Sequence, residues 1–427
     1  MKEFKRVVPM YSFYDRTGIQ NYLQEQAAKG WMLEKVGTVL WRFRRMDPRD
    51  LKFSVVYFPE ADACDPVPGE GEQTFREFCE HAGWHFVASQ AQMQIFYSTS
   101  VNPVPIDTDP AIEVQNIHKS MKKSELLSHW MLLVTAVLQV VVQCLGFTTN
   151  PLGYLSWNVN LYFILFWPSM ILMCTARLIC YYRWYRRAKR AAEEGEFLAS
   201  RGFHCVEAVW ALIAAVGLMA CALPGKNKAS AAIVFIGVVV GLGILGVSIA
   251  AREYFKKRGY TAAQNKVRTI IVTIVAVLIL TAIVTAGVFY VVENTDDDQS
   301  PAIGLSDLMD VEYETLMLED SESILLGRQR VTHYNVQKLP MTELQYQVLH
   351  VKADFLYEMC REKVLTEGYF ELYPIDGEPW GAVEVYEAWR NEELQGYELC
   401  YEDYIVCLWP SWEMTEAQMA IIGNIFK

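Results

Sequence analysis

Five long apolar stretches interrupt the otherwise polar pattern of the chain. They cover residues 126–147, 161–180, 206–223, 229–251 and 269–292. Most have about the 20 residues that a helix needs to cross the hydrocarbon core of a bilayer, and the third is the shortest. The sequence therefore predicts an integral membrane protein with a five-helix transmembrane bundle over residues 126–292, between soluble domains at 1–118 (the head) and 302–427 (the tail).

Basic residues are sorted onto alternate connections between these stretches. They gather before the first stretch, after the second and after the fourth, at Lys119, Lys122, Lys123, Arg177, Arg183, Arg186, Arg187, Lys189, Arg190, Arg201, Arg252, Lys256, Lys257, Arg258, Lys266 and Arg268. The opposite side has only Lys226 and Lys228. Because loops rich in Lys and Arg stay in the cytoplasm, we expect a multi-pass protein of the cell membrane with a cytoplasmic head and, after five crossings, an extracytoplasmic tail.

The head contains an internal repeat. Each copy has a strand candidate, a helical pattern that ends at Gly-Trp (Gly30-Trp31 and Gly83-Trp84), and a strand-like stretch with a Phe at the same distance after the Gly. Glycine is a common helix terminator. The order strand, helix, strand, repeated once, predicts a ferredoxin-like βαββαβ domain with one antiparallel sheet and two helices on one face. That fold carries many functions and identifies none.

Trp31 and Trp84 are the candidate interaction residues of the head. They are either a pair of ligand-stacking aromatics or residues that pack the start of each strand against the preceding helix. Packing is the commoner use of a Trp in this position.

The tail alternates helix and strand patterns and is predicted to be a compact α+β domain. Thr342 and Gln345 match a capping box ahead of a predicted helix that ends at Gly368. Strand candidates follow at 369–373, 383–389, 397–401 and 404–408, and a last helix is predicted to begin at Thr415. Cys400 and Cys407 flank the turn between the last two strands, so either a disulfide or two buried thiols fits the sequence.

Charge limits the partners of each part. The chain has a net charge of −12, with 28 acidic and 8 basic residues from Glu293 onward. An acidic tail argues against nucleic acid as a partner there. The basic residues beside the membrane favour anionic lipids at the cytoplasmic face.

The head resembles the domain of unknown function 2812 (DUF2812), which occurs in membrane proteins of Gram-positive bacteria. The matching positions are Lys29, Gly30 and Trp31, supported by Tyr57, Pro59, Gly83 and Trp84. The family brings no catalytic residues. The resemblance implies a cytosolic interaction or sensing module that is joined to a membrane region.

The search for chemistry gives no catalytic, cofactor or metal site. Cys79, His81 and His85 are close in sequence, but a helix end at Gly83 would separate the two histidines. The sequence Gly241-x-Gly243-x-x-Gly246 matches a dinucleotide fingerprint, yet it lies inside an apolar stretch without the required strand. Gly237 and Gly241, four residues apart, instead predict close helix packing and a possible homo- or hetero-oligomer.

Thr135, Gln139 and Gln143 form a polar stripe on the first apolar stretch. Such a stripe serves either hydrogen bonds between helices or the lining of a permeation path. Two hypotheses of function follow. The first is a sensory or regulatory membrane protein that couples or tethers a cytosolic head, which contacts an unknown cytosolic protein, to an outer domain. The alternative is a transporter or transport-accessory subunit that uses the stripe. An enzyme has less support, because no catalytic motif occurs.

Overall fold

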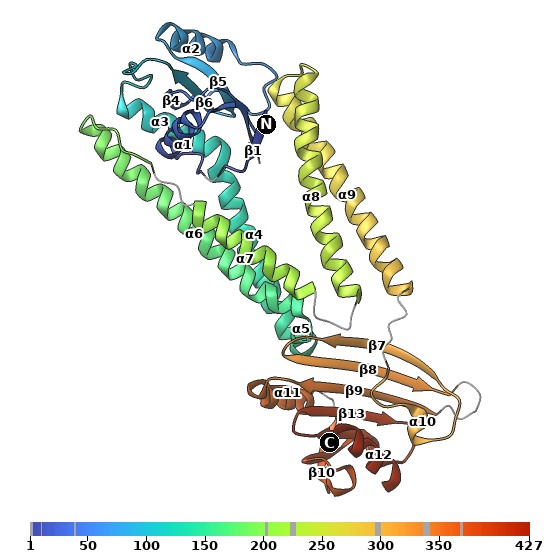
Figure 1. Cartoon of the computed structure of the whole chain (residues 1–427). Coiled ribbons are helices and arrows are strands. Elements are labelled where there is room, and N and C mark those ends of the chain that lie inside the picture. Colours follow the sequence, from blue (N-terminus) through green and yellow to red (C-terminus); the bar gives the residue numbers. More distant parts are fainter. Residues whose placement is uncertain are drawn as a thin grey trace. The chain divides into compact units, whose positions relative to one another are not determined.

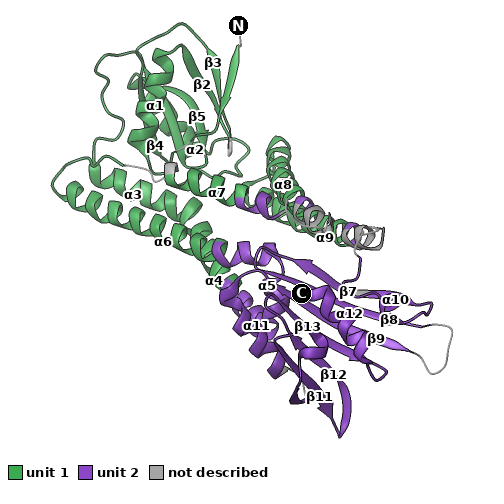
Figure 2. Ribbon diagram, turned by 60° about the horizontal axis from the view of Figure 1, so that its bottom comes forward, with its two compact units in different colours: residues 1–139, 166–216, 237–285 green, residues 140–165, 217–236, 286–427 purple. Residues whose placement is uncertain are grey.

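The computed structural model describes residues 3–9, 11–37, 40–200, 204–222, 228–294, 300–335, 342–367 and 370–427. The chain divides into two compact units (Figure 2). Unit 1 comprises residues 1–139, 166–216 and 237–285, and unit 2 comprises residues 140–165, 217–236 and 286–427. The head thus belongs to unit 1 and the tail to unit 2, and the apolar helices contribute residues to both (Figure 2). Figure 1 labels the helices and strands along the chain.

The head consists of two βαββ copies. The first contains β1 (Phe4–Val7), α1 (Arg16–Ala28), β2 (Trp31–Val36) and β3 (Trp41–Arg45), and the second contains β4 (Lys52–Tyr57), α2 (Glu70–His81), β5 (His85–Gln90) and β6 (Met93–Ser98). Each copy forms its own antiparallel three-stranded sheet, in the orders β1-β3-β2 and β4-β6-β5. The repeat expected from the sequence is therefore present as two small sheets.

The prediction of a single ferredoxin-like sheet in the head is wrong. The stretch after each Gly-Trp, which the sequence pattern suggested was one strand, is a hairpin of two strands: β2 with β3, and β5 with β6. These stretches are about three times the length of an average strand, which is the physical reason they fold back. The second hairpin turns at Ala91, whose φ is +51°. The helix ends were predicted correctly, since Gly30 and Gly83 follow α1 and α2 with φ of +79° and +83°, a conformation that favours glycine.

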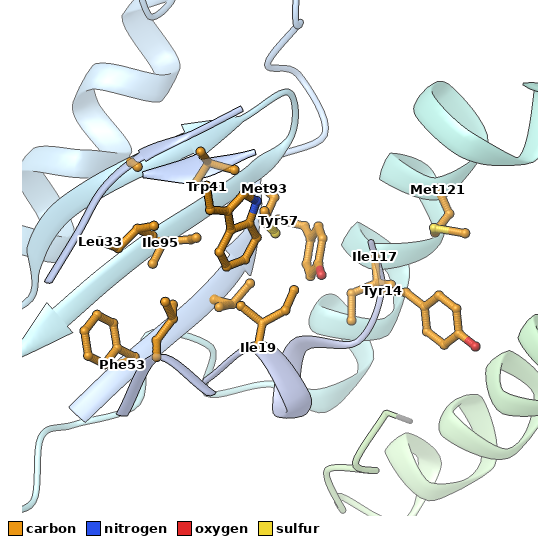
Figure 3. Close-up of a cluster of buried hydrophobic side chains, with 14 of the residues drawn as sticks. Tyr14, Ile19, Leu33, Trp41, Phe53, Tyr57, Met93, Ile95, Ile117 and Met121 are labelled. Carbon is orange, nitrogen blue, oxygen red and sulfur yellow. The ribbon is translucent and has the colours of Figure 1, made fainter. Parts of the chain in front are cut away.

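A single hydrophobic core joins the two copies of the head (Figure 3). Helix α1 packs against both β2 and β4, and it contributes Ile19 and Leu23. Figure 3 shows Ile19 among side chains from both sheets, with Ile117 and Met121 of α3 (Pro110–Met121) at the edge of the cluster. The opposite face of the second sheet has a smaller core, in which Cys79 of α2 packs with Trp84 and Phe96. Both faces of the second sheet are therefore covered.

Long helices follow the head. Helix α3 (Pro110–Met121) continues through a π-helical turn (Lys122–Leu126) into α4 (Leu127–Thr149), and α5 (Pro151–Leu155), α6 (Asn158–Glu193), α7 (His204–Ala222), α8 (Lys228–Lys257) and α9 (Ala262–Asn294) come next. Within the described residues, four helices are long and apolar enough to cross a membrane, at Pro110–Thr149, Asn158–Glu193, Phe235–Lys257 and Ala262–Gly287. The third predicted span corresponds to α7, a shorter apolar helix over Val206–Cys221. The chain is thus a membrane protein by the length and composition of these helices.

The tail is built on a seven-stranded antiparallel sheet with the order β10-β11-β12-β13-β9-β8-β7. Its elements are α10 (Leu305–Leu308), β7 (Glu314–Glu322), β8 (Leu326–Tyr334), β9 (Glu343–Val351), α11 (Asp354–Glu367), β10 (Glu371–Ile375), a 3-10 turn (Glu378–Trp380), β11 (Glu384–Arg390), β12 (Glu393–Cys400), β13 (Tyr404–Pro410) and α12 (Glu416–Phe426). The predicted α+β class is confirmed. The last helix begins as predicted, because Thr415 caps α12 in a capping box with Gln418.

The long predicted helix that ends at Gly368 is wrong in its first half. Residues 343–351 form β9, near the middle of the sheet, and α11 begins only at Asp354. The reason is that β9 is covered on both faces: Leu344 and Tyr346 lie in one core, and Leu349 and Val351 lie in the other. A strand that is buried on both faces has apolar residues at positions that also fit helical spacing.

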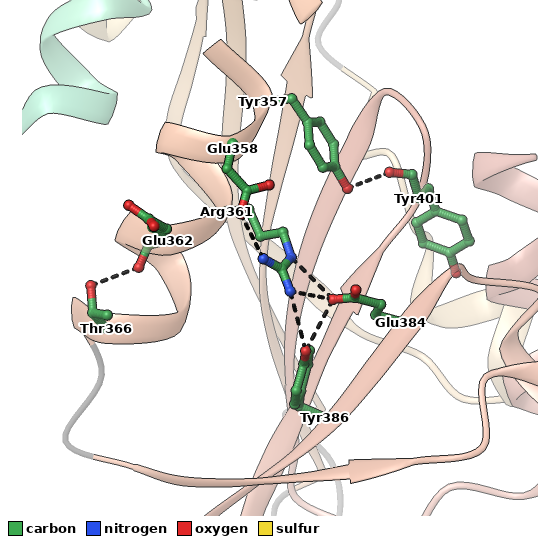
Figure 4. Close-up of polar contacts among 8 residues, drawn as sticks. All are labelled: Tyr357, Glu358, Arg361, Glu362, Thr366, Glu384, Tyr386 and Tyr401. Carbon is green, nitrogen blue, oxygen red and sulfur yellow. Dashed lines mark hydrogen bonds and ion pairs between the residues drawn. The ribbon is translucent and has the colours of Figure 1, made fainter. Parts of the chain in front are cut away.

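Helix α11 is joined to the sheet by polar contacts as well as apolar ones (Figure 4). Arg361 of α11 pairs with Glu384 of β11 at 2.6 Å, and the Tyr386 hydroxyl donates to the same carboxylate at 3.0 Å. The Tyr357 hydroxyl donates to the backbone carbonyl of Tyr401. Hydrogen bonding to Arg361 lowers the pKa of Glu384, so this pair is charged at neutral pH.

Glu398 of β12 is a buried carboxyl group whose pKa is raised. Its side chain is 3% exposed, and one carboxylate oxygen, Oε2, has no hydrogen-bond partner among the described residues. Across the sheet it lies opposite Tyr386 of β11 and Cys407 of β13. Burial raises the pKa of Glu398 to about 7, because the apolar surroundings disfavour its charged form.

We predict that Glu398→Gln stabilises the tail in a pH-dependent way. A carboxyl group with a raised folded-state pKa contributes stability below its unfolded pKa and loses that contribution as pH rises through about 7. The neutral amide should thus gain on the order of 2–3 kcal/mol over Glu398 at pH 8 and nothing at pH 4. Hydrogen exchange of the β12 and β13 amides at the two pH values measures this gain in stability. The exposed Glu393→Gln on the same strand is the control, and an equal gain at both pH values would contradict the prediction.

Candidate functional site

The last turns of α6 are part of the hydrophobic core of the head. Tyr181 is 1% exposed, and it packs with Leu178 among the core residues of the head. The ring of Tyr14, which precedes α1, lies 5.2 Å from the ring of Tyr181 in an edge-to-face arrangement and 5.1 Å from Trp184. Such aromatic pairs add to the burial of apolar area. The head and this apolar helix therefore share one core.

Helix α3 meets α6 through His118. Its Nδ1 atom lies 2.8 Å from the hydroxyl of Tyr181, and its ring stacks on Tyr185 at a centroid distance of 3.9 Å. Tyr181, Trp184 and Tyr185 recur at the three- and four-residue spacing of one helix face. This spacing directs all three aromatic side chains toward α3 and the start of α1.

Arg177 joins three helices one turn before this aromatic cluster. Its guanidinium group lies 2.8 Å from Glu125 and 3.1 Å from Glu207 of α7. Glu125 belongs to the π-helical turn between α3 and α4, a distortion that is often found at functional sites. All three side chains are about a quarter exposed or less, so water screens these pairs less than it screens surface pairs.

The loop at residues 59–65 of the head is held from two sides. Lys123, in the π-helical turn, donates to the carbonyl of Ala61 at 2.9 Å and lies 3.5 Å from the carboxylate of Asp62. Asn265 of α9 is fully buried and donates to the carbonyl of Cys64 at 2.8 Å. The start of α9 is therefore attached to the same loop as the start of α4.

The segment after α6 also contacts the head. The Ser200 hydroxyl lies 3.4 Å from the Asp15 carboxylate and accepts from the backbone N–H of Thr17 at 3.4 Å. Asp15 is the N-cap of α1, where it accepts from the backbone N–H of Gly18. Within unit 1, the head thus contacts α4, α6, α9 and the link between α6 and α7. Arg177 connects α7 to this set.

In unit 2, the connection between α4 and α6 is built into the tail. Leu152 and Leu155 of α5 belong to the core on the α11 side of the sheet. The Ser323 hydroxyl donates to the carbonyl of Leu155 at 2.7 Å, and the Ser321 hydroxyl donates to Ser156 at 2.8 Å. The first residue of α6, Asn158, accepts from the backbone N–H of Ile324 at 3.0 Å.

A buried arginine extends this attachment into the sheet. Arg328 of β8 is 8% exposed and lies 3.3 Å from Glu319 of β7. It donates to Gln347 of β9 at 3.1 Å and to Asn150, the N-cap of α5, at 3.4 Å. Because removal of one partner from a buried charged network is costly, these contacts hold the connection to the sheet.

The predicted interaction residues of the head differ in exposure. Trp84 is buried in the smaller core, and its Nε1 donates to the carbonyl of Val104 at 2.7 Å. Trp31 is partly buried, and the Lys5 ammonium group lies 4.7 Å from its ring. Trp84 has the contacts that the packing interpretation requires, and a ligand role for either residue stays a prediction.

The polar stripe predicted for the first apolar stretch lies on α4, and Gly237 and Gly241 lie on α8. Thr135 uses its hydroxyl within α4, where it donates to the carbonyl of Met131 at 2.9 Å, and Gln139 and Gln143 are half-buried. An added Cβ at Gly237 or Gly241 would meet nothing within 4 Å, so packing at these glycines stays a prediction for another chain.

The cysteines singled out in the sequence are free and buried. Cys400 and Cys407 are free, buried thiols on neighbouring strands, where they lie opposite Ile405 and Glu398. Cys79 is buried, whereas His81 is exposed and contacts the carbonyl of Glu77 in its own helix. Among the described residues, no group of three or more Cys, His, Asp or Glu side chains has the arrangement of a metal site.

The sequence pattern did not identify the junction between the head and α6. Tyr181, Trp184 and Tyr185 follow an apolar stretch, and aromatic residues in such a place are commonly anchors at the membrane interface. A signal was nevertheless present: α6 has 36 residues, many more than one crossing needs, and the three aromatics share one face. An extension of this kind needs another surface to cover it.

Comparison with known proteins supports the resemblance noted for the head. No curated protein and no solved structure matches the chain. A family model described as "Protein of unknown function (DUF2812)" matches residues 15–130. The match runs from the N-cap of α1 through α3 and the π-helical turn to the first turn of α4, so it includes His118 but none of the α6 residues of the junction. Residues 15–130 of this chain are therefore a DUF2812 region, as the resemblance predicted.

Proposed function

We propose that this chain is a regulatory membrane protein in which the helical hairpin α4–α5–α6 couples the tail to the head. One observation carries the proposal: a single helix, α6, has its first residue hydrogen-bonded to the tail and its later residues in the core of the head. A tether would need only covalent connection through a linker. Attachment of one helix to two folded cores is what coupling requires.

The hairpin is suited to transmit a displacement. Helix α6 is continuous over 36 residues, or about 54 Å at 1.5 Å per residue. Pro168 lies inside it and cannot donate the usual backbone hydrogen bond, so the helix has a defined position for bending. A change in the tail that moves α5 would reach Arg177, Tyr181 and Trp184 through this helix.

The proposal includes five membrane crossings, with the head in the cytoplasm and the tail outside the cell membrane. The division into units supports five crossings, because each of α4, α6, α7, α8 and α9 has one part in unit 1 and one part in unit 2. Helix α7 shares this property although it is short. The basic connections all adjoin parts of the helices that belong to unit 1, which supports a cytoplasmic head.

The head would act on an unidentified cytosolic protein, and the basic ends of α6 and α8 would contact anionic lipids. The transport alternative keeps its sequence support in Thr135, Gln139 and Gln143. The Thr135 hydroxyl has a partner in its own helix, the carbonyl of Met131.

The five crossings predict the location of reporters fused after Gly195, Asn227, Tyr260 and Lys427. Alkaline phosphatase, active only outside the cytoplasm, should be active after Asn227 and Lys427 and inactive at the other two positions. A fluorescent protein that folds only in the cytoplasm should give the opposite pattern. Cytoplasmic signals after both Asn227 and Lys427 would mean that α7 does not cross the membrane.

Coupling predicts that weakening the attachment of α5 to the tail changes the head. Leu155→Ala removes a buried side chain next to the tail sheet, which typically costs 2–5 kcal/mol. In the full chain, we expect amides of β4 and β6 in the head to exchange about fivefold faster or more, because coupling free energies are typically 1–3 kcal/mol. Hydrogen–deuterium exchange with mass spectrometry measures this.

The matched control is Ile422→Ala. Ile422 is fully buried in the tail core on the other face of the sheet, so its loss destabilises the tail without removing a side chain of α5. Exchange in the head should then stay at its original rate. Equal effects of the two variants on the head, or no effect of Leu155→Ala, would contradict coupling through the hairpin.

A further inference from the structure

The first sheet of the head has one face in the core and one face open. Trp41 and Phe43 point into the core, so the alternate residues of the same strands lie on the other side. That open basic face consists of Phe4 and Arg6 of β1, Met32 and Lys35 of β2, and Arg42 and Arg44 of β3. Four of these six residues are basic, and Arg6, Lys35 and Arg44 are exposed.

The charges on the open basic face are arranged unfavourably for an isolated sheet. Arg42 lies directly opposite Arg6 on one side and Lys35 on the other. Like charges in such positions destabilise a sheet. Arg42 has one acidic partner, Glu34 at 2.8 Å, whereas Arg6 and Arg44 have no ion pair within the described part of the chain. Surfaces that serve only solubility carry both signs of charge. This arrangement favours an acidic occupant.

The internal repeat shows what covers the corresponding face of the second sheet. Since Phe43 and Phe96 follow Gly30 and Gly83 at equal distances, Arg42 corresponds to Ile95. The strand partner of Ile95 is Val55, as the partner of Arg42 is Arg6. Both Val55 and Ile95 are 0% exposed, and β4 is covered by α1, the helix of the preceding copy. On the corresponding face of the first sheet, Arg6, Lys35 and Arg44 are exposed instead.

Helix α2 is the helix of the last copy, and its outer side has the complementary properties. Glu70, Glu77 and Glu80 are exposed, and the ring of Phe78 is 67% exposed. The outer side of α2 therefore offers one apolar ring among acidic side chains.

The charge of the whole head follows the same division. Residues 1–50 contain ten basic and six acidic side chains, and residues 51–118 contain two basic and ten acidic ones. These opposite charges would attract residues 51–118 of one molecule to residues 1–50 of another molecule. Phe4, which is 36% exposed on the open basic face, would then meet Phe78.

We propose that the acidic outer face of α2 docks on the open basic face of the first sheet in a second copy of this chain. In this contact, α2 of one molecule would cover the first sheet of the other, as α1 covers the second sheet within one molecule. Because the two surfaces differ, the contact between heads is heterologous and forms rings or extended rows of molecules. An acidic cytosolic protein or an anionic lipid would use only the basic face, whereas a second copy uses both.

Charge reversal in the full chain tests the proposal. Variant A carries Arg6→Glu and Arg44→Glu, variant B carries Glu77→Lys and Glu80→Lys, and variant C carries all four changes. Self-association is measured in detergent micelles by energy transfer between copies labelled at the end of the chain, over a range of protein concentrations. We expect at least tenfold weaker association for A and for B, recovery in C, and recovery in a mixture of A with B. Association of the unchanged chain should weaken as salt is raised.

The matched control reverses two other exposed basic residues of the same copy, Lys29→Glu with Arg49→Glu, and should associate as the unchanged chain does. Recovery in C also shows that A and B failed by charge and not by misfolding. Association that is unchanged in A and B, or that fails to recover in C, overturns the proposal. If A alone loses binding to phosphatidylglycerol vesicles or to a glutamate-rich peptide while no variant changes self-association, the basic face serves another partner. This outcome is independent of coupling through α6, which is measured within one chain.

Discussion

The head depends on a hydrophobic core that its own two sheets do not close. Tyr14, Ile117 and the inner faces of both sheets meet side chains from α6, so Leu178 and Tyr181 complete the cluster. Complete burial of such side chains is worth about 1.5–3 kcal/mol each, which is large beside the net stability of a small domain. This shared core sets the position of α6 against the head and explains why polar contacts, such as Arg177 with Glu125 and Glu207, gather beside it.

The core of the tail is also completed by a helix from the membrane region, in this case α5. Helix α5 is too short to be stable alone, and Leu152 and Leu155 order it by packing into the tail core. The buried Arg328 then connects the N-cap of α5 to the middle of the sheet. Each end of the α4–α5–α6 hairpin is thus held by both apolar and hydrogen-bonded contacts. Contacts at both ends of the hairpin are what the proposed coupling requires.

The sequence predicted the features that depend on neighbouring residues, and it did not predict those that depend on contacts between distant residues. Gly30, Gly83 and Thr415 mark helix ends through their own backbone geometry, and four of the five apolar stretches coincide with helices long enough to span a membrane. The hairpins after Gly-Trp were missed because alternating residues continue across a short turn. Strand β9 was taken for a helix because both of its faces are buried. The junction at Tyr181 was missed because its partners, Tyr14 and His118, are distant in sequence.

The most direct measurement compares hydrogen exchange of the head in the full chain and in a Tyr181→Ala variant. Loss of a buried aromatic side chain typically costs 3–5 kcal/mol, so amides of α1, β4 and β6 should lose protection although none of them is changed. The control is Leu172→Ala, because Leu172 lies on the same helix and is 71% exposed. Unchanged protection of the head in Tyr181→Ala, or equal loss in both variants, would contradict the claim that α6 completes the core of the head.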